Sequence, residues 1–172
     1  MPYVYAQARL ASGEGFPMHR TLFFEYPDDP TCWSIEDEYM FGEDLLGAPL
    51  VEEPRVRNVY LPPGARTNYQ GGDSYEGGRW HRIAAGELPV ILLVKGGAAI
   101  LHVALAQSTD RIDWSEIELS VFGAEGKTAD ALICLPDDGT LRRLRLERDG
   151  EGFVLRDDPF EGEVAFTIVQ PA

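Results

Sequence analysis

Positive charge is scarce in this sequence. Its 172 residues contain 15 lysines and arginines against 29 aspartates and glutamates, which gives a formal net charge of -14. A protein with this excess of negative charge repels phosphate backbones and anionic lipid surfaces at long range. We therefore expect neither a nucleic acid nor a membrane as a partner.

Cysteine is scarce as well. Cys32 and Cys134 are the two cysteines of the chain, and neither belongs to a cysteine and histidine pattern with zinc-site spacing. We expect both to be free, reduced thiols in the interior. The glycine-rich segment 71–78, GGDSYEGG, matches neither a dinucleotide-binding nor a P-loop pattern, so we predict a flexible hairpin loop there and no cofactor.

Long apolar runs are also missing. The most apolar stretch, residues 88–106, is interrupted by Lys95 and His102, and the first twenty residues lack a basic flank followed by an apolar core. Neither segment fits a membrane-spanning helix or a signal peptide. The sequence thus predicts a cytoplasmic protein.

The remaining composition, 44% hydrophobic and 10% aromatic, is sufficient for a folded core in one domain or two small ones. Residues 2–12 begin with proline and have apolar residues at helical spacing, which predicts a short helix. Residues 19–25 predict a buried strand. Residues 21–54 contain ten carboxylates and no lysine or arginine, and within them 34–42 predicts one or two helical turns capped by Ser34.

After Gly42 the pattern changes to short strand-like runs separated by proline and glycine, which is typical of an antiparallel β-sandwich. The expected strands are residues 45–51, 57–61, 65–69, 79–83, 89–95, 99–105, 116–122, 131–135, 141–147, 152–156 and 163–169. The segment PDDG at 136–139 predicts a tight hairpin in which Gly139 adopts a positive φ.

Four blocks of this sequence carry a resemblance to a known family. They read PYVYAQARLASGEGFPMHRTLFFEYPDD from residue 2, YMFGEDLLGAPLVEEPRVRNVYLPPG from 39, GGDSYEGGRW from 71 and LPVILLVKGGAAI from 88. In this order and spacing they resemble the end of glycoside hydrolase family 31, the α-glucosidases and α-xylosidases. Beyond Gln107 the resemblance is weaker and rests on ELSVF and PDDG.

The resemblance implies a mainly β fold, an antiparallel β-sandwich preceded by a helix and a strand left from the end of a (β/α)8 barrel. A single helix followed by a single strand is a poor start for a closed domain, so we expect the chain to be the end of something larger. The predicted parts are 1–33, the barrel remnant; 34–110, the proximal C-terminal β-sandwich; and 111–172, further strands that complete the sandwich or start a distal β domain.

Four positions depart from the pattern of the family. Thr21, Gly47, Arg66 and Asn68 stand where proline, valine, tryptophan and aspartate are usual. We interpret these departures as changes on the surface of the sandwich.

The family's two catalytic carboxylates lie upstream of every matched block. Retaining glycoside hydrolysis needs two carboxyl groups about 5–5.5 Å apart across the scissile bond. We therefore predict no catalytic residue in this chain, which would be a non-catalytic C-terminal part of an α-glycosidase. The alternative is a freestanding carbohydrate-binding or interaction module.

Other polar residues have simpler explanations than catalysis or metal binding. His19 opens the predicted barrel strand, whereas His81 and His102 lack the neighbours of a catalytic triad. The acidic residues around the PDDP turn lack the spacing of a calcium loop, so we expect a solvated acidic face and no metal site. They are Asp28, Asp29, Glu36, Asp37 and Glu38.

Three aromatic residues, Tyr69, Tyr75 and Trp80, flank the glycine-rich loop and are the candidate carbohydrate contacts. Exposed rings could stack on a pyranose, although packing at the edge of the sandwich would also explain them. The predicted partners are the upstream catalytic barrel, an oligosaccharide and a second copy of this chain bound through residues 2–26. Without the barrel, that segment would expose apolar side chains; they are Tyr3, Val4, Tyr5, Leu22, Phe23 and Phe24.

Overall fold

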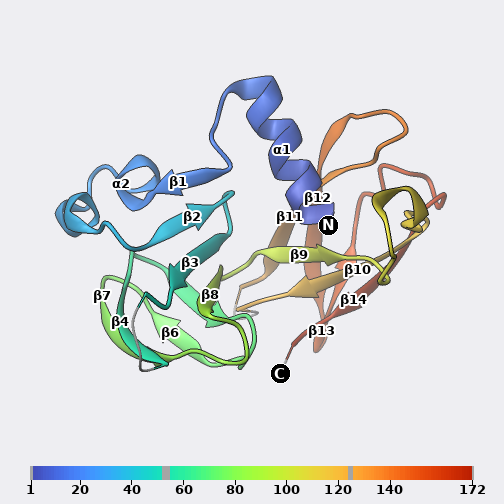
Figure 1. The fold of residues 1–172 in the computed structure, drawn as a ribbon. Helices are drawn as coiled ribbons and strands as arrows, with labels where there is room; N and C mark the ends of the chain where they lie inside the picture. The colour runs from blue at the N-terminus through green and yellow to red at the C-terminus, as the bar shows by residue number, and fades with distance from the viewer. Residues whose placement is uncertain (1, 52–54, 124–125, 172) are drawn as a thin grey trace. The chain divides into compact units, whose positions relative to one another are not determined.

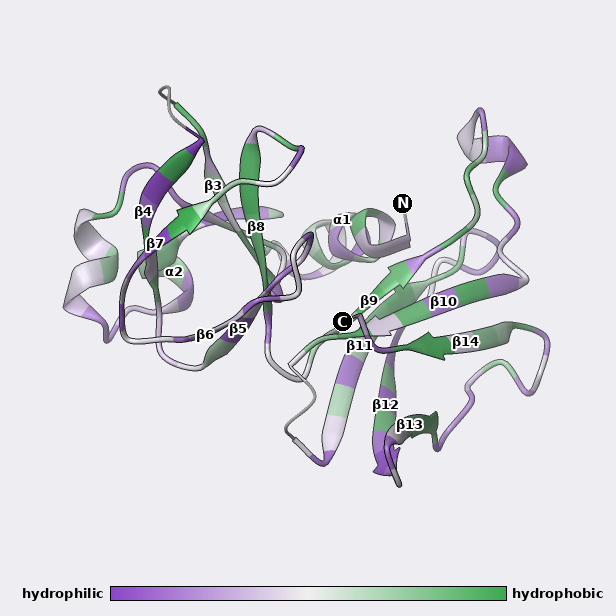
Figure 2. Cartoon of the chain, turned by 90° about the horizontal axis from the view of Figure 1, so that it is seen from below, coloured by the Kyte–Doolittle hydropathy of each residue, from purple (hydrophilic) through white to green (hydrophobic). Residues whose placement is uncertain are grey.

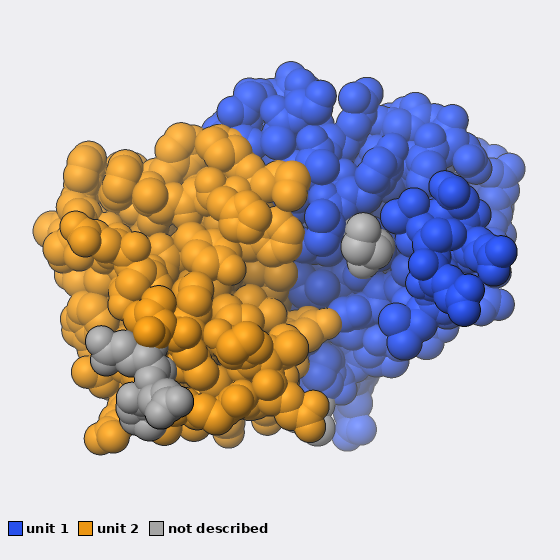
Figure 3. Space-filling model, in the orientation of Figure 1, with its two compact units in different colours: residues 1–16, 97–171 blue, residues 17–96, 172 orange. Residues whose placement is uncertain are grey.

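The computed structural model describes residues 2–51, 55–123 and 126–171 (Figure 1). The chain divides into two compact units (Figure 3). Unit 1 contains residues 2–16 and 97–171, and unit 2 contains residues 17–96. No helix among the described residues is long and apolar enough to cross a membrane.

Unit 2 is built from two antiparallel sheets. Its elements are β1 (His19–Thr21), α2 (Leu22–Glu25), the 3-10 helix η1 (Pro30–Ser34), β2 (Tyr39–Phe41), β3 (Leu45–Pro49), β4 (Val56–Leu61), β5 (Ala65–Asn68), β6 (Ser74–Glu76), β7 (Arg79–Ala84) and β8 (Val90–Lys95). One sheet has the strand order β1-β2-β3-β8-β5-β6 and the other pairs β4 with β7. Met40, Leu46 and Leu93 of the first sheet share one buried cluster with Val59 and Ile83 of the second. Unit 2 is therefore a β-sandwich.

Unit 1 combines a helix with two three-stranded sheets. Its elements are α1 (Pro2–Glu14), β9 (Ala99–His102), the 3-10 helix η2 (Thr109–Arg111), β10 (Glu116–Val121), β11 (Thr128–Cys134), β12 (Leu141–Asp149), β13 (Gly152–Leu155) and β14 (Ala165–Val169). The strand orders are β14-β10-β9 and β11-β12-β13. Both sheets contribute to one apolar cluster that includes Leu119, Ile133 and Leu146. Figure 2 shows this apolar character along β9, and along β8 in unit 2.

The mainly β fold class, with a helix and a strand ahead of antiparallel sheets, is confirmed. Helix 2–12 is also confirmed, as α1. The hairpin at 136–139 joins β11 to β12, and Gly139 has a φ of 61° as predicted. One exception concerns direction: β14 pairs with β10 in parallel, whereas we expected antiparallel strands throughout.

The compact units do not follow the predicted parts 1–33, 34–110 and 111–172. Helix α1 lies in unit 1 because Ala6 and Leu10 pack against Leu132 and Cys134 of β11. Residues 19–34 lie in unit 2, where Leu22 and Cys32 belong to the sandwich core. Residues that are neighbours in the sequence thus enter two different cores.

The strand predicted at 19–25 is wrong over most of its length. Only β1 is extended, and the chain then turns into α2. Arg20 explains the reversal because its Nη1 donates to Glu25 Oε2 at 2.8 Å and its Nε donates to the Pro17 carbonyl at 2.8 Å. Leu22 is fully buried, while Phe23 and Phe24 are exposed.

The helical turns predicted at 34–42 are also wrong. The helical segment is η1, and its cap is Asp29, whose Oδ1 accepts from the Thr31 amide at 3.0 Å. Farther along the segment, Tyr39–Phe41 form β2, which pairs with β1 and β3. Ser34 lies at the end of η1 instead of at its start.

The loop predicted at 71–78 contains a strand that the sequence analysis missed. β6 pairs with β5, so part of the glycine-rich segment belongs to the sheet. Gly77 follows directly, and a Cβ placed there would come within 2.0 Å of the Pro62 carbonyl oxygen. Glycine is required at this position because two backbone segments approach too closely for a side chain.

Candidate functional site

The three predicted carbohydrate contacts have different surroundings in unit 2. Tyr75, on β6, is half-buried against the sandwich core and meets His81 edge-on, with ring centroids 5.2 Å apart. Trp80, on β7, is 53% exposed and lies 5.5 Å from the Tyr60 ring. Tyr69 follows β5, and its amide donates to the Leu92 carbonyl at 2.9 Å. Since Trp80 and His81 are consecutive in β7, they point to opposite faces, so Tyr75 and Trp80 do not share a platform. Their contact with carbohydrate stays a prediction.

A hollow of about 490 Å³ lies where the PDDP turn meets β4 and the β6–β7 turn. Its lining includes the carboxylates of Glu25, Asp28 and Asp29 and the rings of Tyr26 and Tyr60. Two of these carboxylates have partners: Glu25 pairs with Arg20, and Asp29 bonds to Tyr60 and Thr31. Most of the surface that lines the hollow is apolar, and two of its three acidic groups are used to hold the turn.

Asp29 is the best-held of these acids. Its Oδ2 accepts from the Tyr60 hydroxyl at 2.7 Å. Partial burial alone would raise the pKa of this carboxyl, but the hydrogen bonds from Tyr60 and Thr31 outweigh it and lower the pKa below its usual value. Asp29 is thus ionised at neutral pH and cannot serve as a general acid.

Glu38 is buried, contrary to the solvated acidic face predicted for it. The residue is 4% exposed, and Oε1 of its carboxyl accepts from the Tyr60 amide at 2.8 Å. Oε2 has no hydrogen-bond partner among the described residues. Burial raises the pKa of Glu38 to about 7, although the Tyr60 amide and Arg57 act in the opposite direction.

Arg66 is the largest fully buried side chain and is 1% exposed. Its Nη2 donates to the Tyr26 hydroxyl at 2.6 Å, while Nε and Nη1 have no acceptor among the described residues. Asn68 and Gly47 are buried as well. Three of the four departures from the family pattern are therefore interior, and our interpretation of them as surface changes is wrong. The usual tryptophan at position 66 was the signal that could have shown this.

The histidines and the cysteines have structural surroundings. His19 stacks on Phe41 with ring centroids 4.8 Å apart, and a ring nitrogen of His81 lies 2.7 Å from the Glu76 carbonyl oxygen. Burial lowers the pKa of His102, which favours its neutral form. Cys32 and Cys134 are free and buried, as predicted.

Among the described residues, no group of three histidine, cysteine, aspartate or glutamate side chains could hold a metal ion. Four of the described acids of unit 2 are engaged within the unit. Asp37 pairs with Arg57, Glu25 with Arg20 and Asp29 with Tyr60, while Glu38 is enclosed in the core. These four acids are thus held by neighbouring groups or by burial.

Comparison with known proteins explains this geometry. Residues 15–100 match the Glycosyl hydrolase family 31 C-terminal domain. The chain belongs to this family. The matched residues nearly coincide with unit 2, so the β-sandwich is the family 31 domain.

Two relatives match about four fifths of the chain. Alpha-glucosidase 2 of Bacillus thermoamyloliquefaciens is 33% identical over 140 residues, which are 81% of this chain and 18% of that enzyme. The alpha-xylosidase of Emericella nidulans is 30% identical over 144 residues, 79% of this chain and 18% of the enzyme. A family 31 dextranase of Flavobacterium johnsoniae, solved with glucose, is 25% identical, has a TM-score of 0.77 and matches 88% of this chain and 20% of its own. The chain thus spans about a fifth of these larger glycoside hydrolases.

Proposed function

We propose that this chain is the C-terminal β region of an α-glycosidase and supports a catalytic barrel without contributing catalytic carboxylates. The observation that carries this proposal is the match of residues 15–100 to the family's C-terminal domain, within enzymes about five times as long. The internal pairing of the unit 2 acids supports it. Among the substrates named for the relatives, we propose α-glucosides, which rests on the α-glucosidase and the dextranase.

The proposal predicts that the chain alone is inactive and that it can replace the matching segment of a relative. The chain should not hydrolyse p-nitrophenyl α-glucoside or α-xyloside. A chimera of Alpha-glucosidase 2, with its matching segment exchanged for this chain, should retain α-glucosidase activity. The same chimera with Leu46→Asp, which places a charge in the sandwich core, is the control and should be inactive.

Two results would contradict the proposal. One is turnover by the isolated chain that is lost on changing a single carboxylate such as Asp29. The other is a chimera that folds, as judged by its unfolding curve, but has no activity although the relative without the exchange is active.

The partner surface for a barrel is proposed at α2 and η1. Phe23 and Trp33 stack with ring centroids 5.0 Å apart, and both are exposed, as is Phe24.

A homodimer through residues 2–26 stays a prediction, but Tyr3 and Leu22 are buried within the chain and cannot contribute to it. Sedimentation of a variant with Phe23 and Phe24 changed to serine tests this surface. A cytoplasmic location is also a proposal, supported by the two unpaired thiols.

A further inference from the structure

A second hollow lies entirely within unit 1. It encloses about 590 Å³, within the range of roughly 300–1,000 Å³ typical of small-molecule sites. Helix α1 contributes Tyr5, the segment around η2 contributes Asp110 and Trp114, and the turn between β11 and β12 contributes Pro136 and Asp137. Three segments that are distant in the sequence thus meet around one cavity.

Two aromatic rings form a corner of this hollow. The ring centroids of Tyr5 and Trp114 are 6.0 Å apart, and their planes are inclined by 58°. Tyr5 is 37% exposed, whereas Trp114 packs partly against the core of unit 1. Such rings offer large apolar faces at a low cost in side-chain entropy, and the tyrosine adds a hydroxyl.

Two carboxylates beside the rings lack partners. Asp110 and Asp137 make no hydrogen bond or ion pair with any described residue, although both line the hollow. Their acidic neighbours are engaged: Asp113 accepts from Ser115, and Asp138 accepts from Thr140 and Arg142. An ionised carboxylate can only accept hydrogen bonds, so the pair suits a ligand rich in hydroxyl donors.

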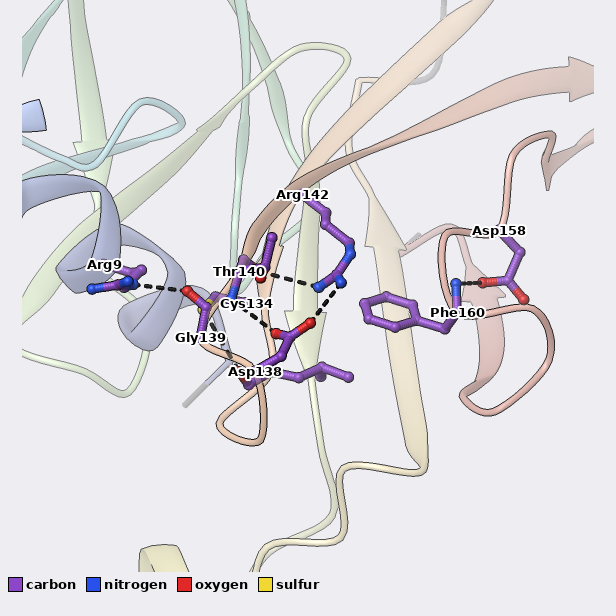
Figure 4. A network of polar contacts seen from close by, with 9 residues as sticks. Arg9, Cys134, Asp138, Gly139, Thr140, Arg142, Asp158 and Phe160 are labelled. Atoms are coloured by element: carbon purple, nitrogen blue, oxygen red, sulfur yellow. Dashed lines mark hydrogen bonds and ion pairs between the residues drawn. The ribbon is translucent and has the colours of Figure 1, made fainter. Parts of the chain in front are cut away.

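The turn that presents Asp137 is held in place by its neighbours (Figure 4). The carboxylate of Asp138 accepts from the Thr140 amide at 2.8 Å and from Arg142 Nη2 at 2.5 Å. Arg9 Nε donates to the Gly139 carbonyl at 2.8 Å, and the Arg142 guanidinium lies 5.0 Å from the centre of the Phe160 ring.

Arg9 also connects the turn to the aromatic wall. It lies four residues after Tyr5 in α1, so both side chains project from the same face of the helix. The contact of Arg9 with Gly139 therefore fixes the helix face that carries Tyr5 against the turn that carries Asp137. The hollow is organised in advance of any ligand, which reduces the entropy cost of binding.

We propose that this hollow, between Tyr5, Trp114, Asp110 and Asp137, binds a short α-glucosidic oligosaccharide. A pyranose has an apolar face for a ring and hydroxyl groups for the carboxylates. None of the described residues that line the hollow is a lysine or arginine, and its two carboxylates disfavour an anion. The choice of glucosyl sugars rests on the proposed function, whereas the position of the site rests on the geometry of unit 1.

Titration of the full chain with isomaltotriose, followed by NMR, tests the site. The Trp114 indole signal should shift in a saturable way, with a Kd of about 1 mM or tighter. Tyr5→Ala should weaken binding about tenfold because it removes one of the two rings. Asp137→Asn should weaken it by a similar factor because it removes a charged acceptor.

Four controls define the result. Trp80→Ala, in unit 2, and Asp157→Asn, an exposed acid outside the hollow, should leave the Kd unchanged. Thermal unfolding of each variant establishes that it is folded. Spermidine is titrated in the same way, because an organic cation could also bind between the rings and the carboxylates of the hollow.

Several outcomes would overturn the inference. They are the absence of saturable binding, binding that is lost in Trp80→Ala but retained in Tyr5→Ala, and binding of spermidine without binding of isomaltotriose. None of them bears on the support role, because the chimera of Alpha-glucosidase 2 reports that role through its activity. A functional chimera together with a chain that binds no sugar would reject this inference alone.

Discussion

The two units bury different kinds of side chain. Among the described residues of unit 1 the core is apolar, and the buried polar side chains, Gln7 and Ser120, carry no charge. Among the described residues, unit 2 buries three side chains of charged residue types together with two further polar side chains. They are Arg20, Glu38, Arg66, Thr67 and Asn68.

This contrast indicates that the stability of each unit depends on a different kind of interaction. A purely apolar core is sensitive to volume, because each lost methylene leaves a cavity. A core with charges is sensitive also to pH and to the pairing of each group, because an unpaired buried charge is costly. Unit 2, the family 31 domain, is therefore the part whose stability should respond to protonation near neutral pH.

The largest expected effect comes from truncating one leucine in each core. Leu46→Ala in unit 2 and Leu119→Ala in unit 1 should each destabilise their own unit by about 2–5 kcal/mol. Each unit holds one buried thiol, Cys32 in unit 2 and Cys134 in unit 1, so thiol labelling reports the opening of each unit separately. Burial raises the pKa of Cys32 to about 12, and the nearby Asp29 adds to the shift, so the native thiol should react slowly.

Labelling of Cys32 should accelerate in Leu46→Ala and labelling of Cys134 in Leu119→Ala. Leu105→Ala, at a fully exposed position, is the control and should change neither rate. Equal acceleration of both thiols in either variant would show that the two units open as one.

The pH dependence of unit 2 should give the next largest effect. The pKa of Glu38 is about 7 in the folded protein and 4.5 as its ordinary value, so the folded state binds the proton more tightly. The contribution of Glu38 to the free energy of unfolding is therefore greatest below pH 4.5. As pH rises from 4.5 to 7, the free energy of unfolding falls by on the order of 3 kcal/mol. Besides Tyr60, the groups that act on Glu38 are Arg57, Asp37 and Arg66.

Glu38→Gln should remove this loss, so that the variant is more stable than the parent at pH 8 and has a flatter profile between pH 5 and 7. Denaturant unfolding at several pH values measures it. Glu36→Gln, at an exposed neighbour, is the matched control. A parent profile that is flat over this interval would refute the burial of the charged carboxyl.

A smaller gain in stability is expected from Arg66→Met. The change removes two buried nitrogen donors, Nε and Nη1, that have no acceptor among the described residues. It also removes the hydrogen bond from Nη2 to the Tyr26 hydroxyl. The balance should stabilise unit 2 by about 1–2 kcal/mol. The measurement belongs at pH 5, where Glu38 is neutral and does not need the positive charge. Arg82→Met, at an exposed position of β7, should stay within about 0.5 kcal/mol of the parent. Loss of stability in Arg66→Met would mean that the guanidinium is a required part of the core.

The smallest effect concerns the exposed turn of unit 1. The hydrogen bonds from Arg142 and Thr140 lower the pKa of Asp138 to about 2. The stabilisation from this group is therefore present above pH 4 and is lost as pH falls towards 2. Asp138→Asn should slightly lower the unfolding midpoint of unit 1 at pH 6, whereas Asp137→Asn, which has no partner to lose, should not. Hydrogen exchange in β11 and β12 of the two variants measures this difference in the stability of unit 1.

Local patterns predicted much of this fold but not its interior charges. Most β-strands of the two units, although not β2 or β6, follow from strand-like runs between prolines and glycines. The positive φ of Gly139 follows from its place at the end of the PDDG turn. The division into units could not be predicted, because it depends on Ala6 and Leu10 packing against β11, far along the chain. The extent of β1 also depends on a contact, between Arg20 and Glu25.

The candidate sites show the same limit. Tyr75 and Trp80 were identified as aromatic residues around a loop, but strand alternation places them on different faces of unit 2. The pair Tyr5 and Trp114 is separated by most of the chain, and no local pattern connects them. The segment PDDG at 136–139 predicts a hairpin, but nothing in this local pattern places Asp137 beside Tyr5 and Trp114.

The arrangement of the units in the sequence has a consequence for synthesis. Unit 2 is one continuous segment and is inserted between α1 and the remainder of unit 1. During translation the sandwich can fold as soon as residues 17–96 have left the ribosome, because domains generally fold as they emerge. Helix α1 is made before the sandwich, but the apolar face with Ala6 and Leu10 has no partner until β11 has been made. Helix α1 is thus synthesised before unit 2 and packed after it, and unit 1 should be the slower of the two units to form because its contacts are the more distant in sequence.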